Sequence, residues 1–137
     1  MSNWLRAQIS TEIKNPKRDL FDAALEDMGY KPDYSRKTVH GAYSFEATES
    51  VDCVLLDKNG QETTIGFSFK PGPEGQVQLS ISGDFYNTPF SGQEFMKKLG
   101  MFYNYEMAKE SLEEQGYTVE DTEVRAHEIV FVGRMAA

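Results

Sequence analysis

Apolar and polar residues alternate along much of this chain of 137 residues. Alternation with a period of two places successive side chains on opposite faces of a strand, so it predicts strands with one buried face. The first such segment, 5–13, lies near the beginning of the chain. Further strands are predicted near 41–47, 51–57, 62–70, 76–86, 117–124 and 128–133.

Two other segments repeat their apolar residues with the period of an α-helix. The first follows Asn15, which we expect to cap the helix, and Pro16, which suits the first helical position. Gly29 is expected to end this helix, because glycine readily adopts the left-handed conformation of a C-terminal cap. The second helix covers 92–115 and is expected to end at Gly116.

Proline and glycine mark the connections. The segment 30–40 is polar and basic and contains Pro32, so we expect a loop there. Asn59-Gly60 predicts a type I′ hairpin turn, because both residues accept the positive φ angles that this turn requires.

These elements predict an α+β domain in the order strand, helix, four strands, helix, two strands. We expect one domain over 1–137, with a single antiparallel sheet of about five to seven strands and both helices on its apolar face. In the strand 76–86, Leu79 and Ile81 face the helices, whereas Asp84 faces the other way. We expect this opposite face, rich in Ser, Gln, Thr and Asp, to be solvated or covered by a partner.

Four motifs make the chain resemble a known family. They are Met1-Ser2-Asn3-Trp4, Ile65-Gly66-Phe67, Phe85-Tyr86-Asn87-Thr88-Pro89-Phe90-Ser91 continuing to Phe95, and Phe102-Tyr103-Asn104-Tyr105. In the same order they are similar to motifs of the family catalogued as domain of unknown function 1257, small proteins of cyanobacteria, red-algal plastids and other bacteria. Its members typically have a histidine where this chain has Asn3, so no role of that histidine carries over. The resemblance covers nearly the whole chain and implies the family's fold, but it supplies no catalytic residues.

The turn after the strand 76–86 is the candidate site for a protein partner. It places Tyr86, Asn87 and Phe90 at a sheet edge beside the start of a helix, where exposed rings and free amides engage another chain. We expect these three residues, together with Tyr105, to bind a partner. The alternative is that the rings cap the end of the core.

The formal net charge is −8, and acidic residues concentrate near the end of the chain. The segment 106–128 holds eight acidic residues against Lys109 and Arg125, which predicts either a solvated helix face or a contact for a basic partner. It argues against nucleic-acid binding, which needs a basic footprint. No apolar run is long enough to span a membrane, and the first residues lack a signal-peptide pattern, so we expect a soluble cytoplasmic protein with no membrane partner. The oligomeric state is not predicted.

Residues typical of catalytic and metal sites are sparse. The histidines, His40 and His127, have no zinc-ligand spacing to the single cysteine, Cys53, which lies in an apolar run. Nucleotide-binding and hydrolase motifs are absent from the sequence. We therefore expect no cofactor, no metal and no enzymatic activity. Three aspartates are expected in turns and at strand edges rather than around a metal: Asp52, Asp57 and Asp84.

Three functional classes remain open. The first is a non-catalytic protein-binding accessory or assembly factor, and the resemblance implies work with a AAA+ ATPase, because members of that family are often encoded near one. The second is a structural or host-interaction protein of a phage or mobile element. The third is an unrecognised enzyme or small-ligand binder, which a pocket lined by Asp84, Tyr86 and His40 would favour.

Overall fold

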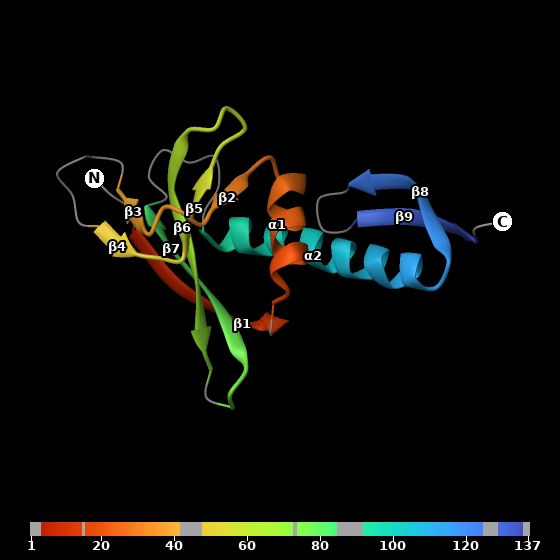
Figure 1. The fold of residues 1–137 in the computed structure, drawn as a ribbon, viewed down its shortest axis with the longest axis horizontal. Helices are drawn as coiled ribbons and strands as arrows, with labels where there is room; N and C mark the ends of the chain where they lie inside the picture. The colour runs from red at the N-terminus through yellow and green to blue at the C-terminus, as the bar shows by residue number, and fades with distance from the viewer. Residues whose placement is uncertain are drawn as a thin grey trace.

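The computed structural model describes residues 4–14, 16–41, 48–72, 74–84, 92–124 and 129–135, with the backbone alone for 4–14, 121, 131, 132 and 135. The strand predicted near 41–47 falls almost entirely outside these residues. The elements, shown in Figure 1, are β1 (Trp4–Lys14), α1 (Arg18–Asp27), β2 (Lys31–Asp33), β3 (Thr38–His40), β4 (Thr48–Ser50), β5 (Cys53–Leu56), β6 (Glu62–Pro71), β7 (Val77–Asp84), α2 (Gly92–Glu114), β8 (Tyr117–Val124) and β9 (Ile129–Met135).

Five strands form one antiparallel sheet in the order β1-β7-β6-β5-β2. Between β6 and β7 the register pairs Phe67 with Ile81 and Phe69 with Leu79, so these apolar residues share one face of the sheet. Both helices lie on that side of the sheet (Figure 1). The predicted α+β class is therefore confirmed.

The core between the sheet and the helices is built around aromatic rings. Phe21 of α1 makes edge-to-face contacts with Phe67, at 5.2 Å between ring centroids, and with Phe69, at 5.3 Å. Phe95 of α2 lies 6.0 Å from Phe67. Burial of each such ring contributes about 1.5–3 kcal/mol. Phe67, Leu79, Ile81 and Leu99 are buried in this core, and Phe102 packs against it partly buried.

The opposite face of the sheet is also buried, and the hairpin formed by β3 and β4 packs on it. Val39 of β3 is fully buried in a second small core with Val51. On β7, Ser80 is 7% exposed and Asp84 is 0% exposed. The prediction that this face is solvated or covered by a partner is wrong here, because the chain's own hairpin packs on it. Gly66 of β6 leaves room for Val51 on this face, because a Cβ on Gly66 would lie 2.9 Å from Val51 Cγ1.

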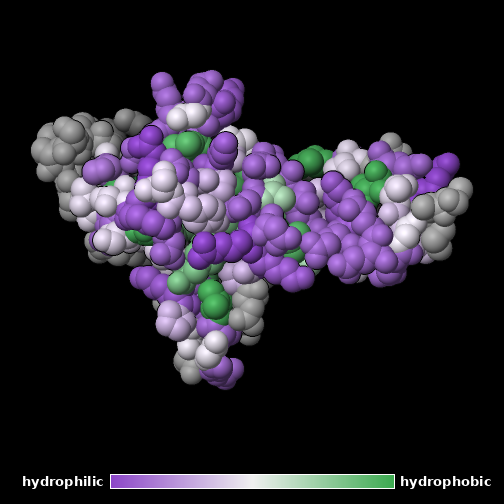
Figure 2. All heavy atoms as spheres, viewed as in Figure 1, coloured by the Kyte–Doolittle hydropathy of each residue, from purple (hydrophilic) through white to green (hydrophobic). Residues whose placement is uncertain are grey.

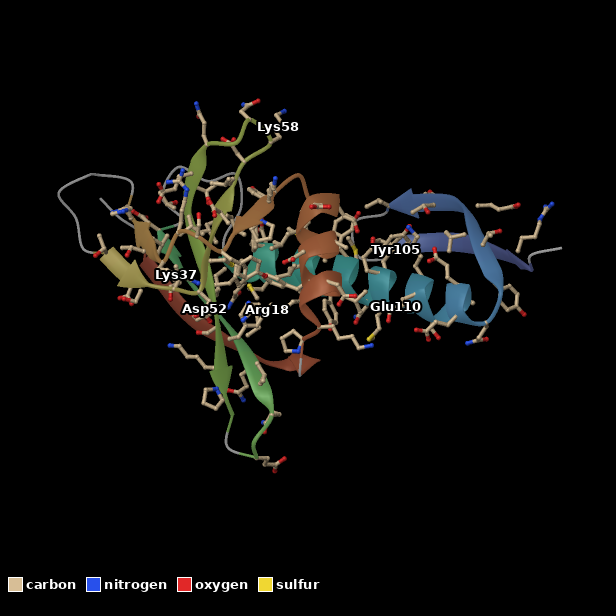
Figure 3. All side chains as sticks on the ribbon, in the orientation of Figure 1. Arg18, Lys37, Asp52, Lys58, Tyr105 and Glu110 are labelled. Atoms are coloured by element: carbon tan, nitrogen blue, oxygen red, sulfur yellow. The ribbon has the colours of Figure 1, made fainter. Side chains whose placement is uncertain are left out.

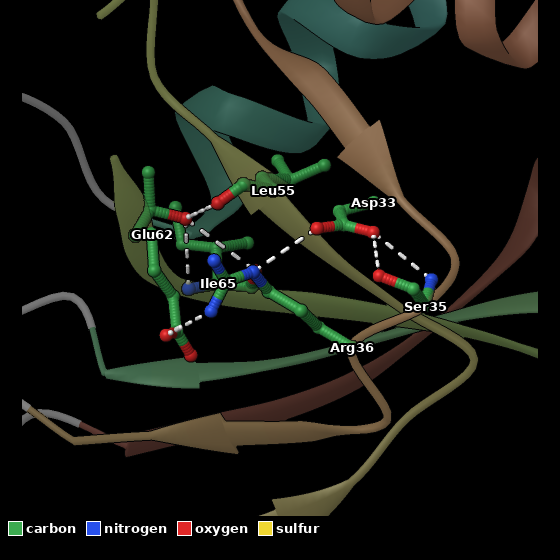
Figure 4. Close-up of polar contacts among 7 residues, drawn as sticks. Asp33, Ser35, Arg36, Leu55, Glu62 and Ile65 are labelled. Atoms are coloured by element: carbon green, nitrogen blue, oxygen red, sulfur yellow. Dashed lines mark hydrogen bonds and ion pairs between the residues drawn. The ribbon is translucent and has the colours of Figure 1, made fainter. Parts of the chain in front are cut away.

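The segment 30–40, predicted as a loop, contains two short strands instead. Strand β2 pairs with β5 at the edge of the sheet, where a proline is tolerated because its missing N–H is not needed. Figure 4 shows how the connection to β3 is fixed. The carboxylate of Asp33 accepts hydrogen bonds from the Ser35 amide (2.9 Å) and from Arg36 Nε (3.0 Å). Arg36 also pairs with Glu62 of β6 at 3.0 Å.

The hairpin turn between β5 and β6 differs from the predicted type I′ turn. The Asp57 carboxylate accepts hydrogen bonds from the amides of Asn59 (2.8 Å) and Gln61 (3.0 Å), and the Gly60 amide donates to the Asp57 carbonyl (2.9 Å). The turn therefore begins at Asp57. The central residues of the turn are Lys58 and Asn59. Gly60, with φ of 78°, follows them as a bulge.

Both helices end as predicted, and one begins differently. Gly29 and Gly116 each follow a helix with φ of 90°, the left-handed conformation expected of a C-terminal cap. The predicted N-terminal cap at Asn15 is wrong, because Lys17 occupies that position. Its amide donates to the Tyr103 hydroxyl at 3.0 Å, so the start of α1 is tied to α2.

Strands β8 and β9 form a hairpin of their own, paired with each other and with no further strand of the described residues. The hairpin packs on α2, where a Cβ on Gly133 would lie 3.3 Å from Leu112 Cδ1. The sequence predicts both strands, and the expected sheet of about five to seven strands leaves open whether they belong to it. The long helix carries the chain beyond that sheet before β8 begins (Figure 1).

Candidate functional site

One of the four residues predicted to bind a partner lies in the described part of the chain. Tyr105 is half-buried on α2 next to the hairpin of β8 and β9 (Figure 3), and its hydroxyl is 3.3 Å from Thr122 Oγ1. It therefore helps to hold the hairpin against the helix. Tyr86, Asn87 and Phe90 lie outside the described residues, so their role in binding stays a prediction.

The residues considered for catalysis or metal binding have structural surroundings. Desolvation raises the pKa of the buried Cys53 thiol to about 12, so the thiol is protonated at neutral pH. The Asp52 carboxylate accepts a hydrogen bond from the Phe69 amide at 2.7 Å. His40 is exposed, and His127 lies outside the described residues. Within the described residues there is no cluster of three or more His, Cys, Asp or Glu that would hold a metal ion.

The second half of α2 and the hairpin of β8 and β9 project beyond the sheet and α1 (Figure 1). We call residues 104–114 of α2, together with β8 and β9, the C-terminal arm. None of its described side chains is fully buried, since the last buried residue of α2 is Tyr103. A helix covered by a single hairpin buries little apolar area, so the arm has little internal stabilisation.

The helix-facing side of the hairpin is incompletely covered by α2. Thr122 contacts Tyr105 of the helix, so Val124, two residues further along β8, lies on the same side. Val124 is nevertheless 56% exposed. Met107 on α2 and Val130 on β9 are also exposed apolar residues. Figure 2 shows hydrophobic atoms among the hydrophilic surface of this part of the molecule.

The arm is acidic. Its charged residues are Glu106, Glu110, Glu113, Glu114, Glu120, Asp121 and Glu123 against Lys109 and Arg134. The ion pairs described for the arm join Glu110 to Lys17 at 3.4 Å and Glu120 to Arg134 at 3.2 Å. Exposed pairs of this kind stabilise a fold little.

Two carboxyl groups meet where α1 packs on α2. Asp27, in the last turn of α1, shares a hydrogen bond with Glu106 of α2, and we call this pair the acid seam. Desolvation, that hydrogen bond and the negative charge of Glu106 raise the pKa of Asp27 to about 7, although Lys109 acts in the opposite direction. The acid seam therefore binds a proton at a pH where an ordinary aspartate is fully ionised.

A separate polar cluster fixes α1 to the sheet. The Arg18 guanidinium (Figure 3) lies 4.3 Å from the ring centroid of Phe69 and 5.0 Å from that of Tyr34. The Tyr34 hydroxyl donates a hydrogen bond to the Asp22 carboxylate at 2.7 Å. Desolvation raises the pKa of Asp22, while that hydrogen bond lowers it. Each cation–π contact stabilises the packing by about 0.5–1 kcal/mol.

Sequence reasoning missed the acid seam because its two members come from different helices. A weak signal is present in the helical period: Asp27 lies three residues after the buried Ala24, and Glu106 lies three residues after the buried Tyr103. Carboxyl groups at the border of an apolar stripe lie beside the packed helix. The sequence does not show that the border of the apolar stripe on α1 packs against the corresponding border on α2.

The comparisons with known proteins agree with the motif resemblance. The model of the family described as "Protein of unknown function (DUF1257)" matches residues 24–132, from within α1 to within β9. Neither a curated protein nor a solved structure matches the chain. None of the helices in the described ranges is long and apolar enough to cross a membrane. Because the family model matches most of the chain, the protein belongs to the DUF1257 family of proteins of unknown function.

Proposed function

We propose that the protein is a non-catalytic accessory or assembly factor that binds another protein through its C-terminal arm. The observation that carries the proposal is the exposure of Val124, which stays 56% exposed on the helix-facing side of a hairpin. Exposed apolar side chains are a feature of protein-interaction surfaces, and the arm carries three, Met107, Val124 and Val130.

The chemistry of the described residues supports the non-catalytic part of the proposal. A nucleophilic cysteine needs a lowered thiol pKa, whereas burial raises that of Cys53. His40 is exposed on β3, a strand on the side of the sheet opposite the helices, and Cys53 belongs to the core on the helix side. This separation argues against a Cys–His pair.

The partner class that we propose is a AAA+ ATPase, on the family association alone. An adaptor for such a motor needs a surface that another chain covers and does not need a reactive group of its own. The exposed apolar side chains of the arm support the first requirement.

Site-specific photo-cross-linking in cells of the native host tests the proposal. A photoreactive amino acid replaces Val124 in one variant and Val77 in the control, since Val77 is also an exposed apolar residue, 39% exposed, but lies on β7. We expect a discrete cross-linked protein from position 124 and none from position 77. Equal labelling at both positions, or none at either, would contradict docking through the arm.

The same assay separates the arm from the aromatic turn. Tyr86→Ala and Phe90→Ala, each combined with the probe at position 124, should reduce the cross-link if the turn also contacts the partner. Thermal melting of both variants must first show that the fold survives.

A further inference from the structure

We propose that the hairpin of β3 and β4, which we call the lid, opens by itself while the rest of the fold stays intact. Opening exposes the outer face of β6 and β7, which is the face of the main sheet that points away from the helices. This inference goes beyond the proposed function, because the lid lies at the end of the molecule opposite the C-terminal arm (Figure 1).

A single buried side chain holds the lid on the sheet. Of the residues of β3 and β4, Val39 alone is buried, and its two neighbours in β3 are exposed. Val39 packs in a small core with Val51 and Val54, which is separate from the large core between the sheet and the helices. Because burial stabilises in proportion to the apolar area removed from water, this small core holds the lid far less firmly than the large core holds the sheet and helices together.

Both connections of the lid to the rest of the chain lie at the same end. The Val51 amide donates a hydrogen bond to the Lys37 carbonyl at 2.9 Å, so the residue before β3 and the residue after β4 are neighbours. The Lys37 ammonium in turn donates to the Asp52 carbonyl at 3.0 Å. The lid can therefore turn about this end without breaking the pairing of β5, β6 and β7, which belong to the other sheet.

The outer face of β6 and β7 consists of small polar residues rather than large apolar ones. Ser68 and Ser82 are 7% and 9% exposed, and Gly66 lies opposite Ser82 in the register of the two strands. A hydroxyl that opening releases is hydrated by water, whereas a released leucine or phenylalanine side chain loses the free energy gained by its burial. Opening on this side of the sheet therefore costs less free energy than separating a helix from the other side.

Thiol labelling of the folded chain tests the inference, because the native cysteine supplies an internal reference. Ser82→Cys places a second thiol on the outer face of β7, whereas Cys53 lies in the core on the helix side of the same sheet. Both thiols react with a disulfide reagent at pH 8, and mass spectrometry of the digested protein measures the rate at each position. An unfolded peptide with one cysteine gives the rate of a fully exposed thiol.

We expect the thiol at position 82 to react at least about tenfold faster than Cys53, and more slowly than the unfolded peptide. Val39→Ala should speed the reaction at position 82 about tenfold, because the truncated side chain holds the lid less firmly. The matched control is Leu99→Ala in the large core, which weakens the closed and the open form alike. It should leave the rate at position 82 unchanged and speed the reaction of Cys53 by about tenfold or more.

Equal rates at positions 82 and 53 would overturn the inference, since unfolding of the whole chain would then expose both thiols. A rate at position 82 equal to that of the unfolded peptide would also overturn it, because the lid would not cover this face. So would acceleration at position 82 by Leu99→Ala, or no acceleration there by Val39→Ala.

Hydrogen exchange of the chain without Ser82→Cys gives a second measurement, which decides the question if thermal melting shows that Ser82→Cys does not fold. Two strands of three residues do not stay paired once they leave the sheet, so opening of the lid frees the amides between β3 and β4. These amides should exchange faster than those that pair β6 with β7, and Leu99→Ala should speed only the second set. Equal exchange of both sets would refute independent opening of the lid.

Discussion

Replacement of Glu106 by glutamine should stabilise the protein at alkaline pH and leave its stability nearly unchanged at acidic pH. In the folded chain the pKa of Asp27 is about 7, against an ordinary value of 3.8. As pH rises from about 4 to about 7, the unfolded chain therefore releases this proton before the folded chain does. The unfavourable contribution of the acid seam is absent below pH 4, develops through that window and is complete above pH 7.

The size of the effect follows from the shift and from the exposure of the pair. A shift of one pKa unit corresponds to about 1.4 kcal/mol. The Asp27 side chain is exposed, so solvent screens the pair and most of that free energy is not realised. We expect Glu106→Gln to raise the free energy of unfolding at pH 8 by about 1 kcal/mol, and the melting temperature by about 4 °C. The glutamine amide also donates a hydrogen bond to the ionised Asp27 carboxylate.

Urea unfolding followed by far-UV circular dichroism, at intervals from pH 4 to pH 8.5, measures this effect. The matched control is Glu113→Gln, which removes one negative charge from an exposed position of the same helix. A stabilisation by Glu106→Gln that does not change with pH would refute the reasoning. So would an equal, parallel effect of Glu113→Gln, because the gain would then come from net charge alone.

Three further predictions test the fold. Phe67→Ala should lower the free energy of unfolding by about 3–5 kcal/mol in urea denaturation, and Gln78→Ala, which is half-buried, by less than about 1 kcal/mol. Gly83→Ala should prevent normal pairing of β6 and β7, because the added Cβ would lie 2.7 Å from the Thr64 carbonyl oxygen; thermal melting should show a loss larger than that of Gln78→Ala. The Cys53 thiol, with its pKa raised to about 12 by burial, should react with a disulfide reagent at pH 8 only as fast as the chain unfolds; immediate reaction would contradict its burial.

The parts of the fold that the sequence predicts are those determined by local chemistry. Alternation in 76–86 assigns Leu79 and Ile81 to the helix-facing side of β7, because strand geometry alone decides which side chains share a face. Gly29 and Gly116 mark the helix ends, because few other residues adopt their backbone conformation at low cost. In each case the signal and the structure lie within a few residues of each other.

The parts that the sequence does not predict depend on contacts between distant segments. Asp84 is fully buried although its place in the alternation suggested a solvated position, because the pattern of one strand does not show what packs on its second face. The polar, uncharged composition of that face suggests a solvated surface or one covered by a partner, and neither is found. The hairpin of β3 and β4 packs on that face and contributes the buried Val39. Its first strand, β3, lies in the polar segment 30–40, which the sequence predicts as a loop.

The acidic segment near the end of the chain shows how far charge composition leads toward the site. Its sequence predicts either a solvated face or a contact for a basic partner, and the contact with a partner stays a prediction. Glu110 and Glu120 have cations within the chain, Lys17 and Arg134, whereas Glu106 faces another carboxyl group. A pair that opposes folding at neutral pH is a local conflict in an otherwise consistent fold, and such conflicts concentrate at functional sites. Glu106→Gln removes this conflict, which is why its effect on stability should depend on pH whereas that of Glu113→Gln should not.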